Sequence, residues 1–202
     1  MTTKSLLTWL ERGLLAVGVV LGLWCAVVLV RAHQTQNLPV PGVTVTQTVL
    51  PGDPTPAPVP APAPGAWVAR LDVPAVKLAT TVLEGTDDGT LRRGSGHIED
   101  TPFPGRTGNV GIAGHRDTVF RPLRHVHVGD DLNLTTADRV YRYRISKTLI
   151  VGPDDVYVLD PTEQPTLTLV TCYPFDFIGH APKRYIIQAT LAEEQPRASA
   201  TK

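Results

Sequence analysis

The segment Thr166-Leu167-Thr168-Leu169-Val170-Thr171-Cys172-Tyr173-Pro174 combines a β-like run with a reactive side chain at its end. Threonine alternates with leucine and valine up to Cys172, a pattern typical of a β-strand. Pro174 has no backbone N–H to donate, so we expect strand pairing to stop close to it. The sequence therefore predicts that a rigid strand holds Cys172 where the strand opens onto a loop.

Further short β-like runs surround this segment and are separated by clusters of Gly, Pro and Asp. They lie at 67–76, 77–83, 109–113, 132–134, 141–151 and 185–191. Short helical turns are expected at 88–93 and 119–126. Many short strands with few helices predict one all-β domain, a barrel or a sandwich, over residues 67–192.

The N-terminal part of the chain has a different character. Residues 13–30 are 18 residues without a charge, bounded by Arg12 and Arg31. This length suits a transmembrane signal-anchor better than a cleaved signal peptide, and a buried globular helix is the alternative. The positive-inside rule slightly favours a cytoplasmic segment at 1–12. We therefore expect a single-pass protein of the cell membrane, with residues 31–202 outside the cytoplasm.

Two segments without a predicted core flank the β-domain. Residues 31–66 are expected to form an extracytoplasmic linker, because nine prolines fall between Pro39 and Pro64. Such a run favours extended polyproline II, with a rise of about 3.1 Å per residue. The last residues, 193–202, are expected to form a flexible tail.

The composition argues against several kinds of function. Lys and Arg together number 19, as do Asp and Glu, so no basic excess indicates a nucleic-acid partner. No acidic cluster has the spacing of a calcium loop, and we expect neither a metal nor another cofactor. The two cysteines, Cys25 in the apolar run and Cys172, do not form a disulfide framework. Cys172 is then either an inert core thiol or a nucleophile.

Two other segments supply side chains that a thiol nucleophile needs. His115 follows the β-like run at 109–113, and Arg184 precedes the run at 185–191. A neighbouring imidazolium favours the thiolate and can protonate a leaving amine. A fixed guanidinium can donate hydrogen bonds to an oxyanion. These residue types alone are a weak signal, because many domains of this size contain them.

Together these motifs resemble the sortase family, and within it the class D sortases most closely. The resemblance covers residues 67–192 and is carried by Thr-Leu-Val-Thr-Cys at 168–172, Gly-His-Arg at 114–116, Lys-Arg-Tyr at 183–185 and Gly-Ser-Gly-His at 94–97. It implies an eight-stranded β-barrel with short helices. An N-terminal signal-anchor is also typical of the family.

The resemblance further implies a membrane-anchored cysteine transpeptidase that cleaves a C-terminal sorting signal of the LPxTG or LPxTA type. Cys172 would be the nucleophile, His115 its acid/base partner and Arg184 the group that stabilises the oxyanion or positions the substrate. Thr171 would contribute to the substrate groove. The implied partners are surface proteins that carry a sorting signal, and an amine acceptor such as a peptidoglycan precursor.

Several alternatives stay open. Rivals to Arg184 are Arg116, Arg142 and Arg144, and His97 and His180 are further histidines to consider for a direct role. The protein could instead be a cysteine protease that hydrolyses such signals, or a catalytically silent binding domain on a stalk. A cysteine transpeptidase of the L,D type is disfavoured, because it usually carries a Ser-His-Gly-Cys-like segment and this chain has none.

Overall fold

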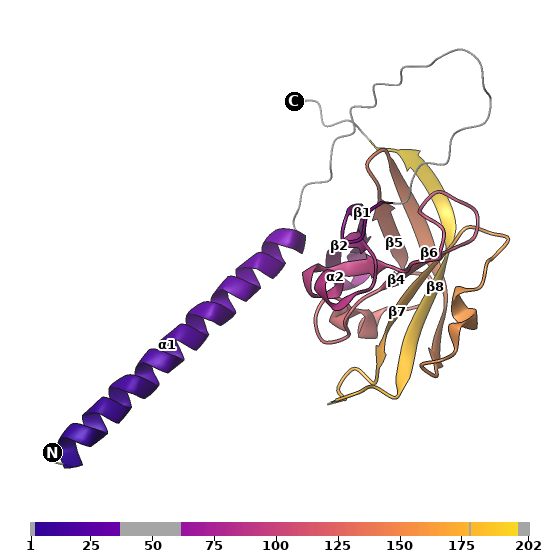
Figure 1. Ribbon diagram of the computed structural model, residues 1–202. Helices are drawn as coiled ribbons and strands as arrows, with labels where there is room; N and C mark the ends of the chain where they lie inside the picture. The colour runs from indigo at the N-terminus through magenta and orange to yellow at the C-terminus, as the bar shows by residue number, and fades with distance from the viewer. Residues whose placement is uncertain (1–2, 37–61, 178, 198–202) are drawn as a thin grey trace.

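The computed structural model describes residues 3–36, 62–177 and 179–197 (Figure 1). It contains a long N-terminal helix, α1 (Thr3–Gln36), and a β-domain that begins at Trp67. Most of the predicted proline-rich linker at 31–66 lies outside the described residues. The same is true of the last five residues of the predicted tail.

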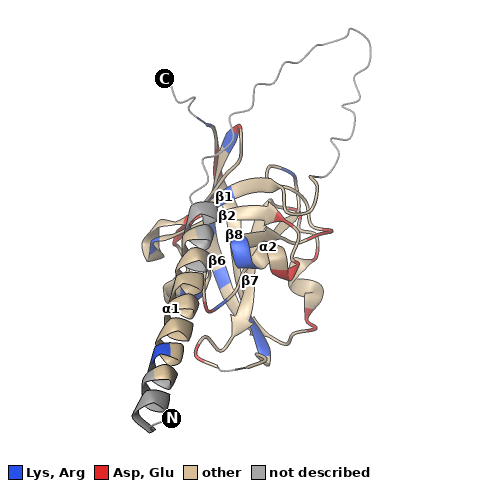
Figure 2. Cartoon of the chain, turned by 60° about the vertical axis from the view of Figure 1, so that its left-hand side comes forward, with Lys and Arg blue, Asp and Glu red and all other residues tan. Residues whose placement is uncertain are grey.

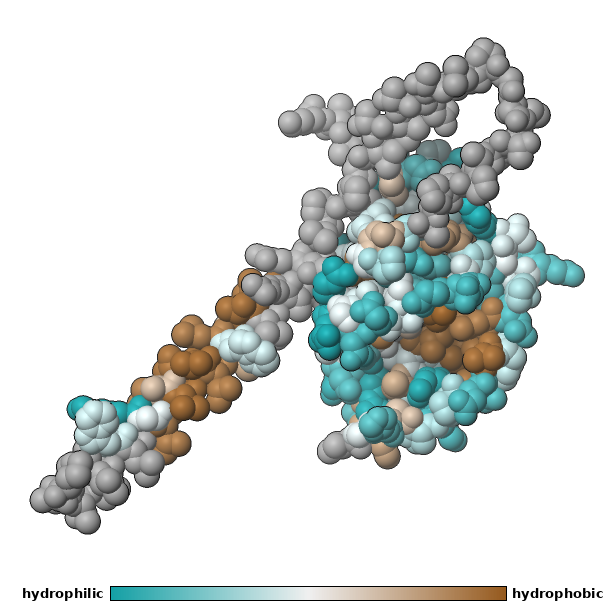
Figure 3. All heavy atoms as spheres, in the orientation of Figure 1, coloured by the Kyte–Doolittle hydropathy of each residue, from teal (hydrophilic) through white to brown (hydrophobic). Residues whose placement is uncertain are grey.

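The apolar run at 13–30 lies within α1, and large apolar side chains along this helix, such as those of Leu15 and Trp24, are exposed. The middle of the helix, where its residues are coloured, is predominantly hydrophobic (Figure 3). Among the helices of the described residues, however, none combines the length and the apolarity that crossing a membrane requires. The prediction of a transmembrane span at 13–30 is therefore not supported.

Eight strands form the β-domain. They are β1 (Trp67–Val73), β2 (Leu78–Glu84), β3 (Ser95–His97), β4 (Asn109–Ala113), β5 (Asp131–Thr135), β6 (Arg139–Val151), β7 (Thr166–Tyr173) and β8 (Lys183–Pro196). They close into a barrel in the order β1-β2-β3-β4-β7-β8-β6-β5. The pairs β2–β3 and β4–β7 are parallel, and the other pairs are antiparallel. The predicted eight-stranded all-β barrel is confirmed.

Short helices connect the strands, as expected at 88–93 and 119–126. They are α2 (Asp88–Arg93) and the 3-10 turns η1 (Pro74–Val76), η2 (Arg121–His125) and η3 (Val156–Leu159). The carboxylate of Asp87 caps α2 by accepting hydrogen bonds from the backbone N–H groups of Gly89 and Thr90. The bond from the Thr90 hydroxyl is the main cause of a lowered Asp87 pKa.

Two predicted boundaries need correction. The run predicted at 67–76 ends as a strand at Val73, because Pro74 fixes its own φ and begins η1. The flexible tail predicted from residue 193 was placed too early. Strand β8 continues to Pro196, where it pairs with Arg139 of β6, so backbone pairing holds these polar residues in the sheet.

The barrel has apolar side chains on its inside, and β7 and β8 also carry a smaller buried cluster on their outer face. From β7, Leu167 and Leu169 point into the barrel core. Val170 points the other way and packs with Ile186 of β8 and Val158 of η3. Because side chains alternate along a strand, Cys172 lies on this outer face together with Val170.

Charged residues of both signs are distributed over the barrel (Figure 2). The formal net charge is zero. In the view of Figure 3 the barrel surface is mostly hydrophilic, with one hydrophobic area on the face that is visible there.

Candidate active site

Cys172 and Arg184 occupy opposite positions on neighbouring strands. In the antiparallel register of β7 and β8, Cys172 pairs with Arg184, two residues beyond the pair Val170 and Ile186. Directly opposed residues have Cβ atoms about 4.5–5.5 Å apart and project from the same face of a sheet. The two residues lie twelve positions apart in the sequence, and both are half-buried.

The parallel pairing of β4 and β7 brings His115 to the same end of the sheet. Ala113 is registered with Val170, and the N–H of Gly114 donates to the Val170 carbonyl over 3.2 Å. His115 follows Ala113 by two residues, as Cys172 follows Val170 by two residues. The histidine, the cysteine and the arginine therefore lie at the same end of three neighbouring strands, which are adjacent in the order β4, β7, β8.

The turn that carries His115 is tightly held. A side chain at Gly114 would not fit, because its Cβ would lie 2.7 Å from the Phe120 ring. The carbonyl of His115 accepts a 3.0 Å hydrogen bond from the Phe120 N–H. The Thr171 hydroxyl donates to the Gly114 carbonyl over 2.7 Å.

Thr171 is buried, with 3% of its surface exposed. It lies on the inward side of β7, between the outward-facing Val170 and Cys172. This position gives Thr171 a supporting role between two strand ends. The contribution of Thr171 to a substrate groove stays a prediction.

At the start of β8, Arg184 is held by the carbonyl of Ala181 in the preceding loop and by that of Lys183, the first residue of the strand. Its Nη1 donates to the carbonyl of Ala181 over 3.3 Å and to that of Lys183 over 3.1 Å. A guanidinium fixed in this way can direct further N–H groups toward an oxygen atom near Cys172.

The three rival arginines lie in other surroundings. Arg142 and Arg144 are on β6, where they form ion pairs with Glu193 and Asp131. Arg116 follows His115 directly, but its side chain is buried and donates to backbone carbonyls of the β7–β8 loop. Of the four arginines, only Arg184 is registered with Cys172.

The two further histidines also differ in their surroundings. His97 is 1% exposed, lies 2.9 Å from the Glu84 carboxylate through Nδ1, and stacks on Phe103. These contacts indicate a structural role at the β2–β3 pair. His180 is exposed on the β7–β8 loop. In the described part of the chain, no group of three or more His, Cys, Asp or Glu side chains is arranged to hold a metal ion.

A buried polar network beside the site was not predicted from the sequence. Thr168 donates to Asn109 Oδ1 over 2.6 Å, and the amide groups of Asn109 and Gln188 donate to the Val158 carbonyl over 2.9 and 2.8 Å. The network fixes η3 against β4, β7 and β8. The only sequence signal for it is the presence of polar residues inside runs that are otherwise apolar.

Aromatic residues cover the region next to Cys172 and Arg184. Tyr185 has ring-centroid distances of 6.2 Å to Tyr173 and 5.4 Å to Phe175. The Arg124 guanidinium lies 5.4 Å from the centre of the Phe175 ring. These contacts connect η2, the end of β7 and the start of β8.

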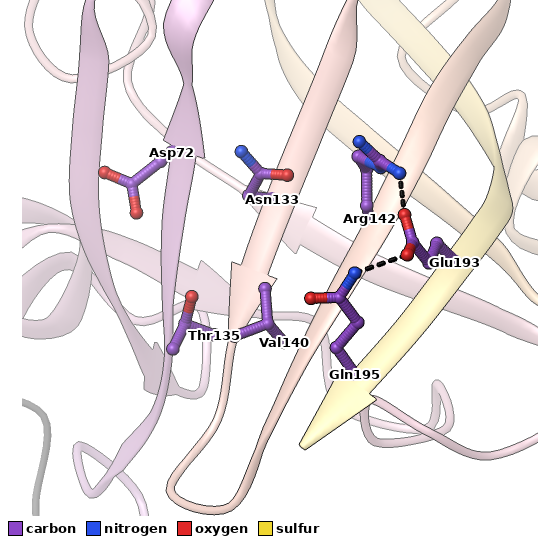
Figure 4. Close-up of a pocket in the computed structure, with 7 residues that line it drawn as sticks. All are labelled: Asp72, Asn133, Thr135, Val140, Arg142, Glu193 and Gln195. Atoms are coloured by element: carbon purple, nitrogen blue, oxygen red, sulfur yellow. Dashed lines mark hydrogen bonds and ion pairs between the residues drawn. The ribbon is translucent and has the colours of Figure 1, made fainter. Parts of the chain in front are cut away.

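A polar depression on another part of the barrel is shown in Figure 4. It is lined by Asp72, Asn133, Thr135, Val140, Arg142, Glu193 and Gln195. Four of these form one row across the strands, because Asp72 pairs with Asn133, Asn133 with Arg142, and Arg142 with Glu193. None of the predicted catalytic residues lines this depression. Glu193 is also nine residues from Arg184 along β8, or roughly 30 Å at the usual strand rise.

Comparisons with known proteins agree with this architecture. The family model described as the Sortase domain matches residues 71–192. Sortase D of Bacillus subtilis (strain 168) is 42% identical over 118 residues, which cover 58% of this chain and 60% of that protein. Sortase A of Listeria monocytogenes is 32% identical over 134 residues, covering 64% and 59%. The chain thus matches about three fifths of the length of each of these two relatives.

Solved structures show the same fold. A Clostridium perfringens Sortase D5 transpeptidase superposes with a TM-score of 0.60 at 32% identity, covering 65% of this chain and 82% of that one. Listeria monocytogenes sortase A superposes with a TM-score of 0.61 at 28% identity, covering 66% and 92%.

Proposed function

The chain belongs to the sortase family, and on that premise we propose that it is a cysteine transpeptidase with Cys172, His115 and Arg184 as its catalytic residues. The observation that carries the proposal is the strand register. The register pairs Cys172 of β7 with Arg184 of β8. It also brings the turn after β4, which carries His115, to the same end of the sheet as this pair. Three chemically complementary side chains thereby share one end of a rigid sheet.

In the proposed reaction the Cys172 thiolate attacks a peptide carbonyl carbon of the substrate. The oxyanion that forms accepts hydrogen bonds from Arg184. Protonated His115 gives its proton to the leaving amine, the C–N bond breaks, and a thioester on Cys172 remains. An incoming amine then attacks the thioester while His115 takes up a proton, and the thiolate is released.

The proposed substrate is a C-terminal sorting signal of the LPxTG or LPxTA type on a surface protein. The carbonyl that reacts would be that of the threonine, and the proposed acceptor is an amine such as that of a peptidoglycan precursor. Family membership supports this substrate class. The apolar outer surface near the site, which includes the partly buried Val170 and Leu149, supports binding of an apolar peptide segment.

We further propose that the barrel acts outside the cytoplasm at the cell membrane. The support is the exposed apolar surface of α1, which a membrane would remove from water. The full-length chain is then expected to sediment with membranes and to remain there after a carbonate or high-salt wash. Quantitative release of the intact chain by salt would contradict this localisation.

The activity is tested by incubating the full-length chain with a sorting-signal peptide and triglycine, and identifying the products by mass spectrometry. Formation of the peptide–triglycine product supports transpeptidation. Hydrolysis alone, even at saturating triglycine, would indicate a protease. Absence of both products over a panel of sorting signals would favour a silent binding domain. The matched control is Cys172→Ala, which should form neither product, whereas Cys25→Ala should behave like the unchanged protein.

A further inference from the structure

Arg116 has an unusual environment for an arginine. Its side chain is buried, with 6% of the residue exposed, although it stands next to the half-buried His115. All three guanidinium nitrogens are engaged. Nε donates to the exposed carboxylate of Asp117 over 3.3 Å, and the two Nη atoms donate to backbone carbonyls.

The carbonyl partners of Arg116 all lie on the loop between β7 and β8. Nη1 donates to Pro174 over 3.0 Å, and Nη2 donates to Phe177 over 2.6 Å and to Gly179 over 3.0 Å. The guanidinium carbon also lies 6.0 Å from the centre of the Phe177 ring. One side chain from the β4 turn therefore fixes three points of a loop about sixty residues away in the sequence.

Burying a guanidinium is costly unless its N–H groups are satisfied, and here loop carbonyls satisfy most of them. The planar fork of arginine donates in fixed directions, so it determines the shape of the loop as well as its position. Lysine has only a compact ammonium group and could not bond the same three carbonyls in the same geometry.

The loop that Arg116 holds ends at the carbonyls that hold Arg184. Arg184 Nη1 donates to the carbonyls of Ala181 and Lys183, which come two and four residues after Gly179, the last residue that Arg116 bonds. The Ala181 carbonyl therefore links the loop that Arg116 holds to the Arg184 guanidinium, whose residue is registered with Cys172.

We propose that Arg116 is a positioning residue, which acts through the β7–β8 loop to orient Arg184 for stabilisation of the oxyanion. This inference rests on the proposed function. The two arginines then have different roles. Arg184 contacts the oxyanion of the substrate, and Arg116 holds the loop that orients Arg184.

The test is a double-mutant cycle on the full-length chain, with kcat and KM measured on a sorting-signal peptide. Arg116→Gln should lower kcat by about a hundredfold with little change in KM, the size of effect expected when a catalytic group is misplaced by about 1 Å. In an Arg184→Lys background the same substitution should cost far less, because the geometry it protects is already lost. Arg116→Lys should restore part of the rate that Arg116→Gln loses.

Arg144→Gln is the matched control, since Arg144 also donates to a carboxylate but lies on β6. It should leave kcat unchanged. Circular dichroism checks that each variant is folded at the assay temperature. Hydrogen exchange should be faster in the β7–β8 loop, residues 174–182, of Arg116→Gln but not of Arg144→Gln. If Arg116→Gln is unfolded, the cycle is run with Arg116→Lys, which should still lower kcat.

Full additivity of the Arg116 and Arg184 substitutions would overturn the inference, as would a folded Arg116 variant with normal kcat. Either result, obtained while the unchanged chain is active, leaves the proposed function standing. An unchanged chain without any activity would instead overturn the proposed function.

Discussion

The buried hydroxyl of Thr171 donates a 2.7 Å hydrogen bond to the carbonyl of Gly114. Thr171 immediately precedes Cys172, and Gly114 immediately precedes His115. The bond therefore links the two strand ends from which the proposed nucleophile and its acid/base partner emerge.

Thr171→Val should weaken both the fold and the proposed activity. Valine has a similar shape but cannot donate, so the buried Gly114 carbonyl loses its partner at a cost of about 1–3 kcal/mol. We expect a lower free energy of unfolding in urea and a lower kcat for peptide cleavage. Thr171→Ser keeps the hydroxyl and should retain more of both. If Thr171→Val has the same free energy of unfolding and the same kcat as the unchanged chain, the hydrogen bond from Thr171 to Gly114 contributes to neither.

Arg184→Lys should lose most of the rate although it keeps the positive charge. Losing one directed donor to an oxyanion typically costs about 2.7–4 kcal/mol, or roughly a hundred- to a thousandfold in kcat. Substrate binding should change less than turnover, because the contact forms mainly in the transition state. The measurement is the kcat and KM of Arg184→Lys and Arg184→Ala. Near-normal turnover in both folded variants would exclude Arg184 from the site.

The pH profile of cleavage should be bell-shaped. The proposed active form needs a deprotonated thiol and a protonated imidazole, so the rate falls when either condition fails. His115→Ala should remove most of the activity and the limb that depends on histidine. An unchanged profile in this variant would point to another base, and His180→Ala would be the next variant to examine.

The cap of α2 should make stability depend on acid. Hydrogen bonds from the Thr90 hydroxyl and backbone N–H lower the pKa of Asp87 in the folded protein. A lowered folded pKa means that the stabilisation is present above the unfolded pKa of about 3.9 and is lost as pH falls through the folded pKa. Asp87→Ala should therefore lower the Tm at neutral pH, and the difference in Tm should shrink as the pH falls below about 3.9. A Tm difference that stays constant over this range would contradict the assignment.

Much of the barrel could be predicted from local patterns, because β7 and its neighbours alternate or carry runs of β-branched residues. Strand β3 could not, since Ser95, Gly96 and His97 are all buried and form a run too short to show a period. The end of β8 was also missed. Its polar residues resemble a tail in the sequence, and only the pairing with β6 places them in the sheet.

The identities of the proposed catalytic residues were accessible from motifs, but their arrangement was not. Register depends on pairing between segments that are distant in the sequence, so the alignment of Cys172 with Arg184 appears only in the fold. The proposed role of Arg116 could not be predicted from the sequence either, because it depends on contacts between distant segments. Beside His115 it resembles a catalytic candidate, whereas its hydrogen-bond partners lie on a loop that follows β7.

The central claim is that Cys172 forms a thioester with the sorting signal, and intact-protein mass spectrometry measures this most directly. The full-length chain is mixed with a library of sorting-signal peptides, without an amine acceptor, and quenched in acid. We predict a mass increase equal to that of the acyl group that ends in threonine, with loss of the thiol hydrogen, located on Cys172 and absent when triglycine is added before the quench. The Cys172→Ala variant should show no adduct. Peptide cleavage by folded Cys172→Ala, or an adduct on any other residue, would contradict the account.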